Sequence, residues 1–236
     1  KLVGRSRAVS GDGVVELPNA PEKEARKLAQ YVESLGAMAV PELELELLAR
    51  HGHFLMPVVL HGVPRELPEN KRPPFLRGAD WDRAVFPTDL LVRLGARPAD
   101  AVQFLSPSHA DSSFDDVPRQ ISSSVGTVII TDVPEVDIAH AWVRLTAVQN
   151  LAKKRDINRV RVYGGDLDWE ELQKDLSARF PDLSPRARPW EEENQALVWA
   201  LGLESAVMLF LFGAMTALVS LCISAGLMIF FAGLFD

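Results

Sequence analysis

The chain has 236 residues, a formal net charge of −7 and 24% charged residues. This length suits one large domain or two modest ones. A mildly acidic chain is poorly suited to a phosphate backbone, so we expect no nucleic-acid partner.

The N-terminal part of the sequence alternates strand and helix patterns. Residues 14–17 predict a short strand, and residues 19–36 predict a helix with one apolar face that ends at a glycine. In residues 40–48 leucines alternate with glutamates, which predicts a half-buried strand. Residues 53–63 predict a further strand, which Pro57 places at an edge or a bulge.

The middle of the sequence has mostly loop and strand patterns. A proline-rich loop over residues 63–82 precedes a short helix over 86–96 and a strand over 100–107. Residues 106–124 are polar and contain proline, which is typical of an exposed loop or a hairpin tip. Residues 125–133 are rich in β-branched side chains and predict a strand.

The elements then alternate again. We expect a helix over residues 135–154, a strand over 157–164 with alternate valines facing inward, and a helix over 166–180 capped by Asp168. The whole order is strand–helix–strand, a mostly β middle, and helix–strand–helix. It predicts an α+β fold in which the middle is inserted into a split unit.

The C-terminal segment differs in composition from everything before it. No Lys or Arg follows Glu204, and of the 32 acidic residues only Asp236 does. Residues 205–235 are apolar on all sides of a helix, and a membrane span needs about 20 such residues. We therefore expect a transmembrane helix in contact with membrane lipid, entered by a continuous helix from residue 190. The only cysteine, Cys222, lies inside it, so no internal disulfide forms.

The sequence contains few patterns that carry chemistry. It has no GxxxxGK[ST] phosphate loop, no GxGxxG and no GxSxG. His51, His53 and His61 lie close in sequence, but no cysteine or HExxH pattern accompanies them, so we interpret them as surface or strand-end histidines. We expect no enzyme, no catalytic residue, no metal site and no cofactor in this chain.

Charges near the predicted span indicate its orientation. The acidic run at residues 191–193 is interpreted as a solvated helix face, and Arg186 and Arg188 are the only basic residues close by. Positive charge concentrates on the cytoplasmic side of membrane helices, so we expect the soluble part outside the cytoplasm. Trp190 and Trp199 fit an interfacial aromatic belt, although either could be a core residue.

Three stretches, taken in order, resemble one protein family. They are "FPTDLLVRLGARPADAVQFLSP", "VGTVIITDVPEVDIAHAWVRLTAVQNL" and "WEEENQALVWALGLESAVMLFLFGAMTALVSLCISAGLMIF". In this order they resemble the extracytoplasmic domain and following membrane helix of MacB-type ABC transporter permeases, and most closely the lipoprotein-releasing (Lol-type) permeases. Residues 98–100 replace the usual Gly-Asp of the family's segment.

The resemblance implies a domain arrangement and a set of partners. A porter-like part would comprise residues 1–47 and 133–189, an inserted β-rich sabre-like part residues 52–132, and the periplasmic helix entry and transmembrane helix residues 190–236. A first membrane helix would precede Lys1. In the bacterial inner membrane, two permease subunits, homologous or identical, would pair with a cytoplasmic ATPase dimer that binds ATP and Mg. The complex would extract lipoproteins and deliver them to a periplasmic carrier.

Two groups of candidate site residues follow from this resemblance. A protruding loop would bind the carrier through Phe114, Val117, Pro118 and Arg119; the alternative is an ordinary solvated loop. One stripe of the membrane helix would line an acyl-chain path, the alternative being lipid contact or helix packing. The stripe comprises Met208, Leu211, Met215, Val219 and Cys222.

Two other functions stay open at this point. A MacB- or FtsX-like permease would transmit mechanical work to an efflux duct or a cell-wall hydrolase. A protein of another class would be a single-span anchored extracytoplasmic binding protein. Further apolar runs on both sides of residues 1–236 in the gene would favour a permease over the anchored protein.

Overall fold

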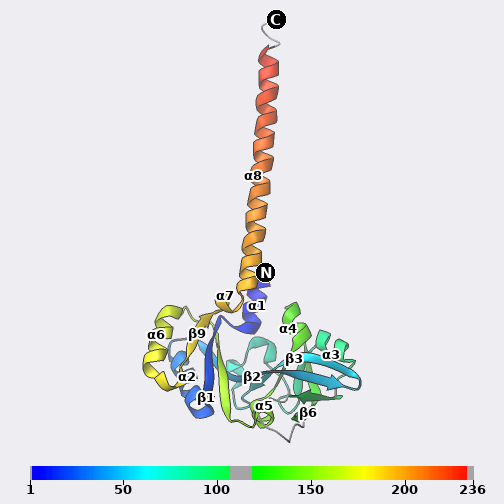
Figure 1. Cartoon of the computed structure of the whole chain (residues 1–236), viewed down its shortest axis with the longest axis vertical. Helices are drawn as coiled ribbons and strands as arrows, with labels where there is room; N and C mark the ends of the chain where they lie inside the picture. The colour runs from blue at the N-terminus through cyan, green and yellow to red at the C-terminus, as the bar shows by residue number, and fades with distance from the viewer. Residues whose placement is uncertain (1, 107–118, 233–236) are drawn as a thin grey trace, which may run out of the picture. The chain divides into compact units, whose positions relative to one another are not determined.

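The computed structural model describes residues 2–106 and 119–232, and the chain divides into two units at Glu193 and Asn194 (Figure 1). The helices are α1 Leu2–Ser10, α2 Glu22–Ser34, α3 Thr88–Leu94, α4 Pro134–Ala139, α5 Leu145–Ala152, α6 Trp169–Arg179, α7 Trp190–Glu193 and α8 Gln195–Ala232. The strands are β1 Gly13–Pro21, β2 Met38–His51, β3 Phe54–Val63, β4 Ala84–Pro87, β5 Ala101–Leu105, β6 Gln120–Ile129, β7 His140–Arg144, β8 Asp156–Tyr163 and β9 Arg186–Pro189. Short 3-10 helices occupy Glu69–Lys71, Pro74–Leu76 and Pro181–Leu183.

Six strands of the first unit close on themselves. Each strand pairs with the next in the order β2, β3, β7, β4, β6 and β5, and β5 pairs again with β2. The contact between β4 and β7 is a single residue pair, Val85 with Trp142. Side chains fill the interior, where the rings of Phe86 and Phe104 stack with their centroids 5.9 Å apart. The result is a small closed barrel with a packed core.

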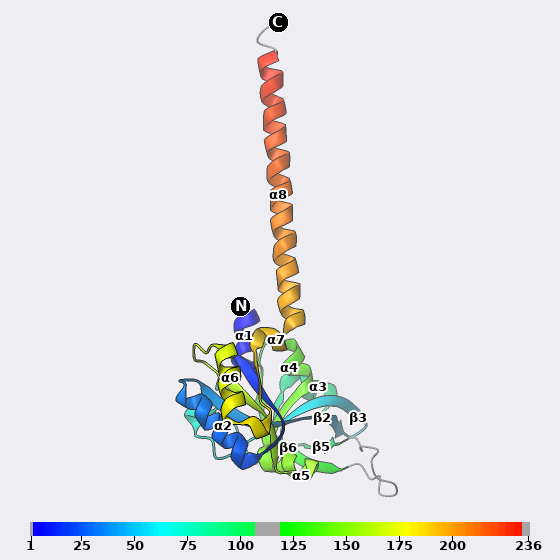
Figure 2. The same ribbon diagram turned by 60° about the vertical axis from the view of Figure 1, so that its left-hand side comes forward.

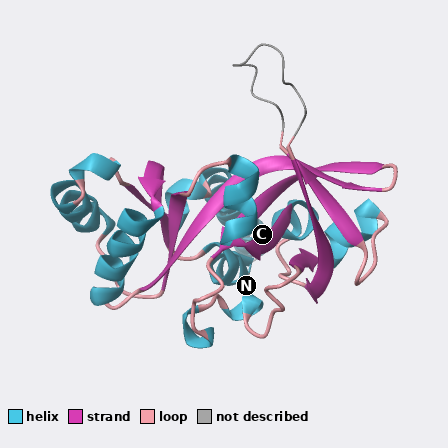
Figure 3. Ribbon diagram, turned by 90° about the horizontal axis from the view of Figure 1, so that it is seen from below, coloured by secondary structure: helices cyan, strands magenta, loops and turns pink. Residues whose placement is uncertain are grey.

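The remaining strands form an open sheet that shares β2 with the barrel (Figure 3). In the order β2, β8, β1 and β9, all neighbours are antiparallel. Helices α2 and α6 lie side by side over this sheet, joined by a 2.8 Å hydrogen bond from Tyr31 Oη to Asp175 (Figure 2). Because β2 is 14 residues long, its first half belongs to the open sheet and its second half to the barrel. The open sheet and the barrel are therefore connected through the backbone of β2.

The structure confirms a mixed α+β domain followed by a long apolar helix. Strands and helices lie where the sequence predicts them over most of the chain, and Pro57 lies where β3 has only β2 as a neighbour. The second unit contains α8, which is long and apolar enough to cross a membrane over Gln195–Met228. The boundaries 1–47, 52–132, 133–189 and 190–236 stay a prediction.

Three local predictions are wrong. Residues 135–154 are not one helix, because His140–Arg144 forms β7 in parallel register with β3, between α4 and α5 in the chain, and buries Trp142 against His61 and Phe75. Residues 120–124, expected in a loop, begin β6 because they pair with β5. The helix from residue 190 is interrupted: α7 ends at Glu193 and α8 begins at Gln195.

Gly13 lies where the open sheet leaves no space for a side chain. A Cβ atom there would overlap the ring of Trp169 and the main-chain carbonyl oxygen of Arg188. We expect Gly13→Ala to lower the free energy of unfolding by about 2 kcal/mol, because the carbonyl belongs to the paired strand β9 and cannot move aside. Urea unfolding of the detergent-solubilised chain measures this. Gly4→Ala is the control, since a Cβ at Gly4 meets nothing within 4 Å, and a loss equal to that of Gly13→Ala would contradict the packing described.

Candidate functional site

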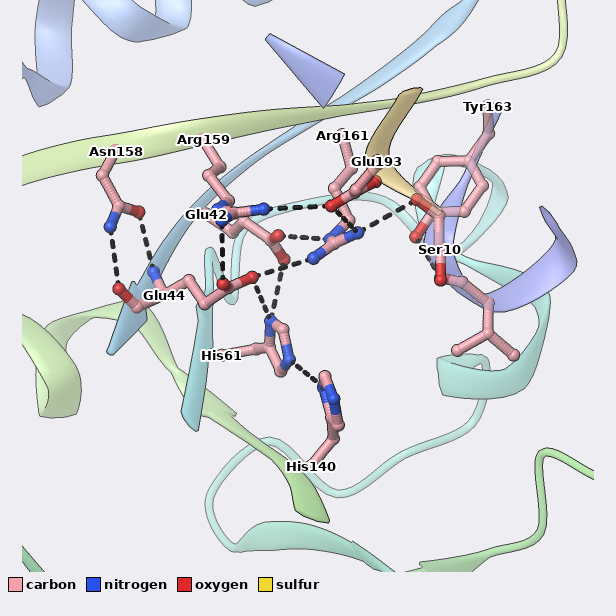
Figure 4. Close-up of polar contacts among 11 residues, drawn as sticks. Ser10, Glu42, Glu44, His61, His140, Asn158, Arg159, Arg161, Tyr163 and Glu193 are labelled. Atoms are coloured by element: carbon pink, nitrogen blue, oxygen red, sulfur yellow. Dashed lines mark hydrogen bonds and ion pairs between the residues drawn. The ribbon is translucent and has the colours of Figure 1, made fainter. Parts of the chain in front are cut away.

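Charged side chains from both sheets meet beneath the first and last helices of the domain (Figure 4). Strand β2 supplies Glu42 and Glu44, and β8 supplies Arg159 and Arg161, which the β2–β8 register places side by side. Alternation along each strand puts the leucines of β2 and the valines of β8 on the opposite face. The remaining members are His61 of β3, His140 of β7 and Glu193 of α7. We call these seven residues the ion network.

Arg161 is the centre of the ion network. Its Nε donates a hydrogen bond to Glu42, and its Nη2 donates to Glu44 Oε2 at 2.8 Å. Its Nη1 donates to the carbonyl oxygen of Ser10, the last residue of α1, at 3.0 Å. The side chains of Arg161 and Glu42 are only 10% and 3% exposed, so these ion pairs are almost fully removed from water. Breaking such a pair on one side leaves a buried charge uncompensated.

Arg159 connects the ion network to the last helix of the domain. Its Nη1 donates to Glu193 Oε1 at 3.0 Å, and its Nη2 lies 3.2 Å from Glu44 Oε1. The carboxylate of Glu193 is also 3.8 Å from Arg161 Nη1. Two guanidinium groups therefore face three carboxylates.

The two histidines extend the cluster into the barrel wall. His61 Nδ1 lies 3.5 Å from Glu42 Oε2 and 3.6 Å from Glu44 Oε2, and its Nε2 is 2.8 Å from His140 Nδ1. A hydrogen bond between two ring nitrogens needs a proton on one of them only. Burial, and then the nearby His61 and Arg161, lower the pKa of His140 to about 3, so His140 is neutral.

The carboxylates are held in the charged form. Burial alone would raise the pKa of Glu42, but the charges of Arg161 and His61 outweigh burial and lower the pKa to about 2. Burial likewise opposes the charge of Arg161, and Glu42, Glu44 and Glu193 together raise its pKa above the ordinary value. Burial raises the pKa of Tyr163, whose hydroxyl donates to the carbonyl oxygen of Val9 at 3.0 Å.

The ion network could be mistaken for a metal centre. Glu42, Glu44 and His61 each offer one ligand atom, and these atoms lie within 4.8 Å of one another. Arg161 already occupies both carboxylates, and a guanidinium cannot give up its proton to make room for a dication. The adjacent cavity, of about 30 Å³, has room for one or two waters but not for an organic substrate. This arrangement favours a structural role, and the absence of a metal stays a prediction.

The first and last helices of the domain are bound to each other above the ion network. Trp190 of α7 is 1% exposed; its Nε1 donates to Ser6 Oγ at 3.3 Å, and its main-chain N–H donates to the carbonyl oxygen of Asp12 at 2.8 Å. Arg7 forms an ion pair with Glu191, and its guanidinium lies 5.3 Å from the centroid of the Trp190 ring. Helices α1 and α7 are therefore fixed to the same buried centre, through Ser10 and Glu193.

The structure corrects three interpretations of the sequence. His61 is 1% exposed and belongs to the ion network, whereas His51 and His53 lie at the end of β2 and in the turn after it, as expected. The acidic run at 191–193 is solvated in part: Glu191 and Glu192 are exposed, whereas Glu193 is half-buried and pairs with Arg159. Trp190 is a core residue and no part of an aromatic belt, while Trp199 on α8 is 69% exposed.

The other candidate residues lie away from the ion network. Phe114, Val117 and Pro118 lie outside the described residues; Arg119 is exposed, and its carbonyl oxygen accepts from the main-chain N–H of Ser106 at 2.9 Å. The stripe proposed for an acyl-chain path is exposed on α8, and its role stays a prediction. Its members are Met208, Leu211, Met215, Val219 and Cys222.

Sequence reasoning missed most of the ion network. The available signal was the alternation of charged and apolar residues in two stretches, "ELELE" at residues 42–46 and "RVRVY" at residues 159–163. Each stretch predicts a strand with one polar face. These two polar faces form one buried cluster only because β2 pairs with β8 and because α1 and α7 contact the arginines of β8.

No protein-family model and no curated protein matches the chain. Among solved structures, it is similar to the extracellular domain of the noncanonic ABC-type transporter YknZ from Gram-positive bacteria, at 11% identity and a TM-score of 0.46 over 75% of this chain and 98% of that chain. It is also similar to the periplasmic region of MacB from Actinobacillus actinomycetemcomitans, at 11% identity and a TM-score of 0.46 over 83% of this chain and 97% of that chain. At TM-scores below 0.5, neither likeness carries a functional argument.

Removing Arg161 tests whether the ion network stabilises the domain. We expect Arg161→Met to lower the free energy of unfolding by about 3 to 5 kcal/mol, because the buried carboxylate of Glu42 loses its main partner. The matched control is Arg188→Met, which breaks a more exposed pair with Glu16 at 3.5 Å and should cost about 0 to 1 kcal/mol. Urea unfolding of the detergent-solubilised chain gives both values. Equal losses in the two variants would contradict the central role of Arg161.

The neutral His140 predicts a pH dependence of stability. Between pH 6.5 and about 3 the unfolded chain binds a proton at His140 and the folded chain does not, so the free energy of unfolding falls as the pH is lowered through this window. We expect His140→Gln to reduce the slope between pH 6.5 and 4.5 by up to about 1.4 kcal/mol per pH unit. Urea titrations at several pH values measure the slope, with His53→Gln as the control. An unchanged slope in His140→Gln would show that His140 titrates normally.

Proposed function

We propose that the chain is the extracytoplasmic domain and following membrane helix of an ABC transporter permease subunit, in which the domain moves with its membrane segments. The observation that carries this proposal is the ion network. It joins the last residue of α1 and the last residue of α7 to the strand β2 that both sheets share. A movement applied to either helix would therefore reach the open sheet and the barrel together.

Sequence features support the membrane part of the proposal. The stretch that follows α7 is the apolar helix α8, and the ordered motifs resemble those of MacB-type permeases. With acidic residues before the apolar segment, the domain would lie outside the cytoplasm. We place it in the periplasm, next to the inner membrane, with a further membrane helix leading into α1.

The energy source would be a separate subunit. The chain has no phosphate-binding loop, so ATP and Mg would bind a cytoplasmic ATPase dimer, and a second permease, homologous or identical, would complete the complex. The permease itself would catalyse no covalent step. Its work would be the conversion of ATP-driven movement into movement of the domain.

Lipoprotein release is the finer form of this proposal. Extracting a lipid anchor costs about 0.8 kcal/mol for each CH₂ group transferred to water, so it needs an apolar path and an external energy source. The exposed apolar stripe on α8 would supply such a path, and the loop around residues 114–119 would bind a periplasmic carrier. A MacB- or FtsX-like use of the same movement needs neither feature. In the third candidate, a single-span anchored binding protein, the ion network would stabilise the domain but would not transmit movement.

The proposal is tested on the full-length protein purified with its ATPase. A spin label at Val92→Cys, a 73% exposed position on α3, is introduced in a Cys222→Ser background. We expect the distance between the labelled domains of paired permeases to change on ATP binding. Glu193→Gln should reduce that change by at least half, because it weakens the link between α7 and Arg159.

Glu16→Gln is the matched control, since Glu16 pairs with Arg188 at the edge of the open sheet. It should leave the distance change as in the unmodified protein. Failure to co-purify any ATPase would contradict the permease assignment. A full distance change in Glu193→Gln would instead contradict the mechanical role of the ion network. Stimulation of ATP hydrolysis by a triacylated lipoprotein separates lipoprotein release from the other permease functions.

A further inference from the structure

Among residues 2–106 and 119–232, no strand lies beside one edge of β6 over the first half of its length. On one side β6 pairs with β5 through Gln120–Ser124. On the other side, the pairing of β4 with β6 begins only at Val125, because β4 is four residues long. The chain before β4 does not continue along residues 120–124, since the N–H of Asp80 donates to Oγ1 of Thr127, further along β6. Residues 120–124 are therefore an open strand edge in the barrel wall.

The hydrogen-bonding groups of this edge can be assigned to a side. Ser106 N–H donates to Arg119 C=O at 2.9 Å, and Val125 N–H donates to Asp100 C=O at 2.9 Å. Main-chain groups of an antiparallel strand alternate in direction, so the odd-numbered residues of β6 face β5. Those of Gln120 and Ser122 point the other way, and no main-chain partner meets them there among residues 2–106 and 119–232.

A groove of about 450 Å³ lies along this edge. It is lined by residues 121–124 of β6, by Arg144 of β7, and by Ala147 and Asn150 of α5. The volume is in the range of ligand-binding pockets, and far larger than one or two waters require. An added strand would lie about 4.8 Å from β6, with its side chains pointing alternately to the two sides.

The groove is locally cationic in a chain of net charge −7. Arg144 makes no ion pair within the described ranges, and Arg83, at the end of the groove, meets only the half-exposed Asp80 at 3.7 Å. Among the described residues that line the groove, Asp82 is the acidic one, and it is already held by Arg65 at 2.8 Å. The charge facing the groove is therefore complementary to a carboxylate.

We propose that this groove binds an extended acidic segment of a partner protein, which adds to the open edge of β6 as a further strand and places a carboxylate against Arg144. Main-chain hydrogen bonds to Ser122 supply affinity, and the arginines supply selectivity for acidic side chains. This binding does not depend on the permease assignment, because it uses only the barrel and its own charges.

The experiment uses the full chain in detergent micelles and a phage-displayed library of random dodecapeptides. We expect the selected peptides to be rich in β-branched and acidic residues. The affinity of a selected peptide should fall at least tenfold when alternate amides are N-methylated, since this removes donors and blocks strand pairing. Exchange of its acidic residues for lysine should lower affinity by a similar factor.

Two variants of the chain locate the contact. Ser122→Pro removes an N–H that points into the groove and leaves the bonds to β5, and it should lower peptide affinity at least tenfold, whereas Ser122→Ala should keep it. Arg144→Glu should disfavour the acidic peptide and favour its lysine counterpart. Circular dichroism and thermal unfolding confirm that each variant is folded.

Several outcomes would overturn the proposal. These are no enrichment of peptides over a micelle-only selection, peptides that bind Ser122→Pro as well as the unmodified chain, or a preference for basic peptides. If sedimentation shows that the unmodified chain is a dimer and Ser122→Pro is a monomer, the edge serves a second copy of this chain and the proposed partner is wrong.

Discussion

A buried guanidinium is the constraint on which the rest of the domain depends. Arg161 cannot lose its proton, so every element around it must supply a negative or carbonyl oxygen: Glu42 and Glu44 from β2, and Ser10 from the end of α1. Glu193 then completes the shell from α7. The cost of leaving any of these charges unpaired away from water links the strand register, the ends of two helices and the barrel wall into one arrangement.

This constraint helps to make the part of the chain up to Glu193 one compact unit although it contains two sheets. Strand β2 passes from the open sheet into the barrel, and the ion network lies at the crossing. Helices α1 and α7 contact the same centre and each other through Trp190. The movement proposed for the domain depends on this connection between its first and last helices.

The short strand β4 determines how the barrel closes. With four residues it suffices to close the barrel around Phe86 and Phe104. It is too short to cover the whole of β6, so within the part of the chain that the structure describes, an unpaired edge of β6 remains in the groove that Arg144 lines. Barrel closure normally removes such edges, and an uncovered one invites another strand. Arg83 and Arg144 line the groove beside this edge, so their charges favour a strand with acidic side chains.

The sequence by itself determined the elements whose signals are local. The apolar run became α8, the alternating stretches became β2 and β8, and Asp168 caps α6 through the N–H groups of Glu170 and Glu171 as expected. Local signals could not place β7, because "HAWVR" is a strand only through its register with β3. They also could not show that Glu42 and His61 are buried, since a charged residue in a strand predicts exposure unless a partner is known. Tertiary structure alone brought those partners together, because the ion pairs join residues more than a hundred positions apart in the chain.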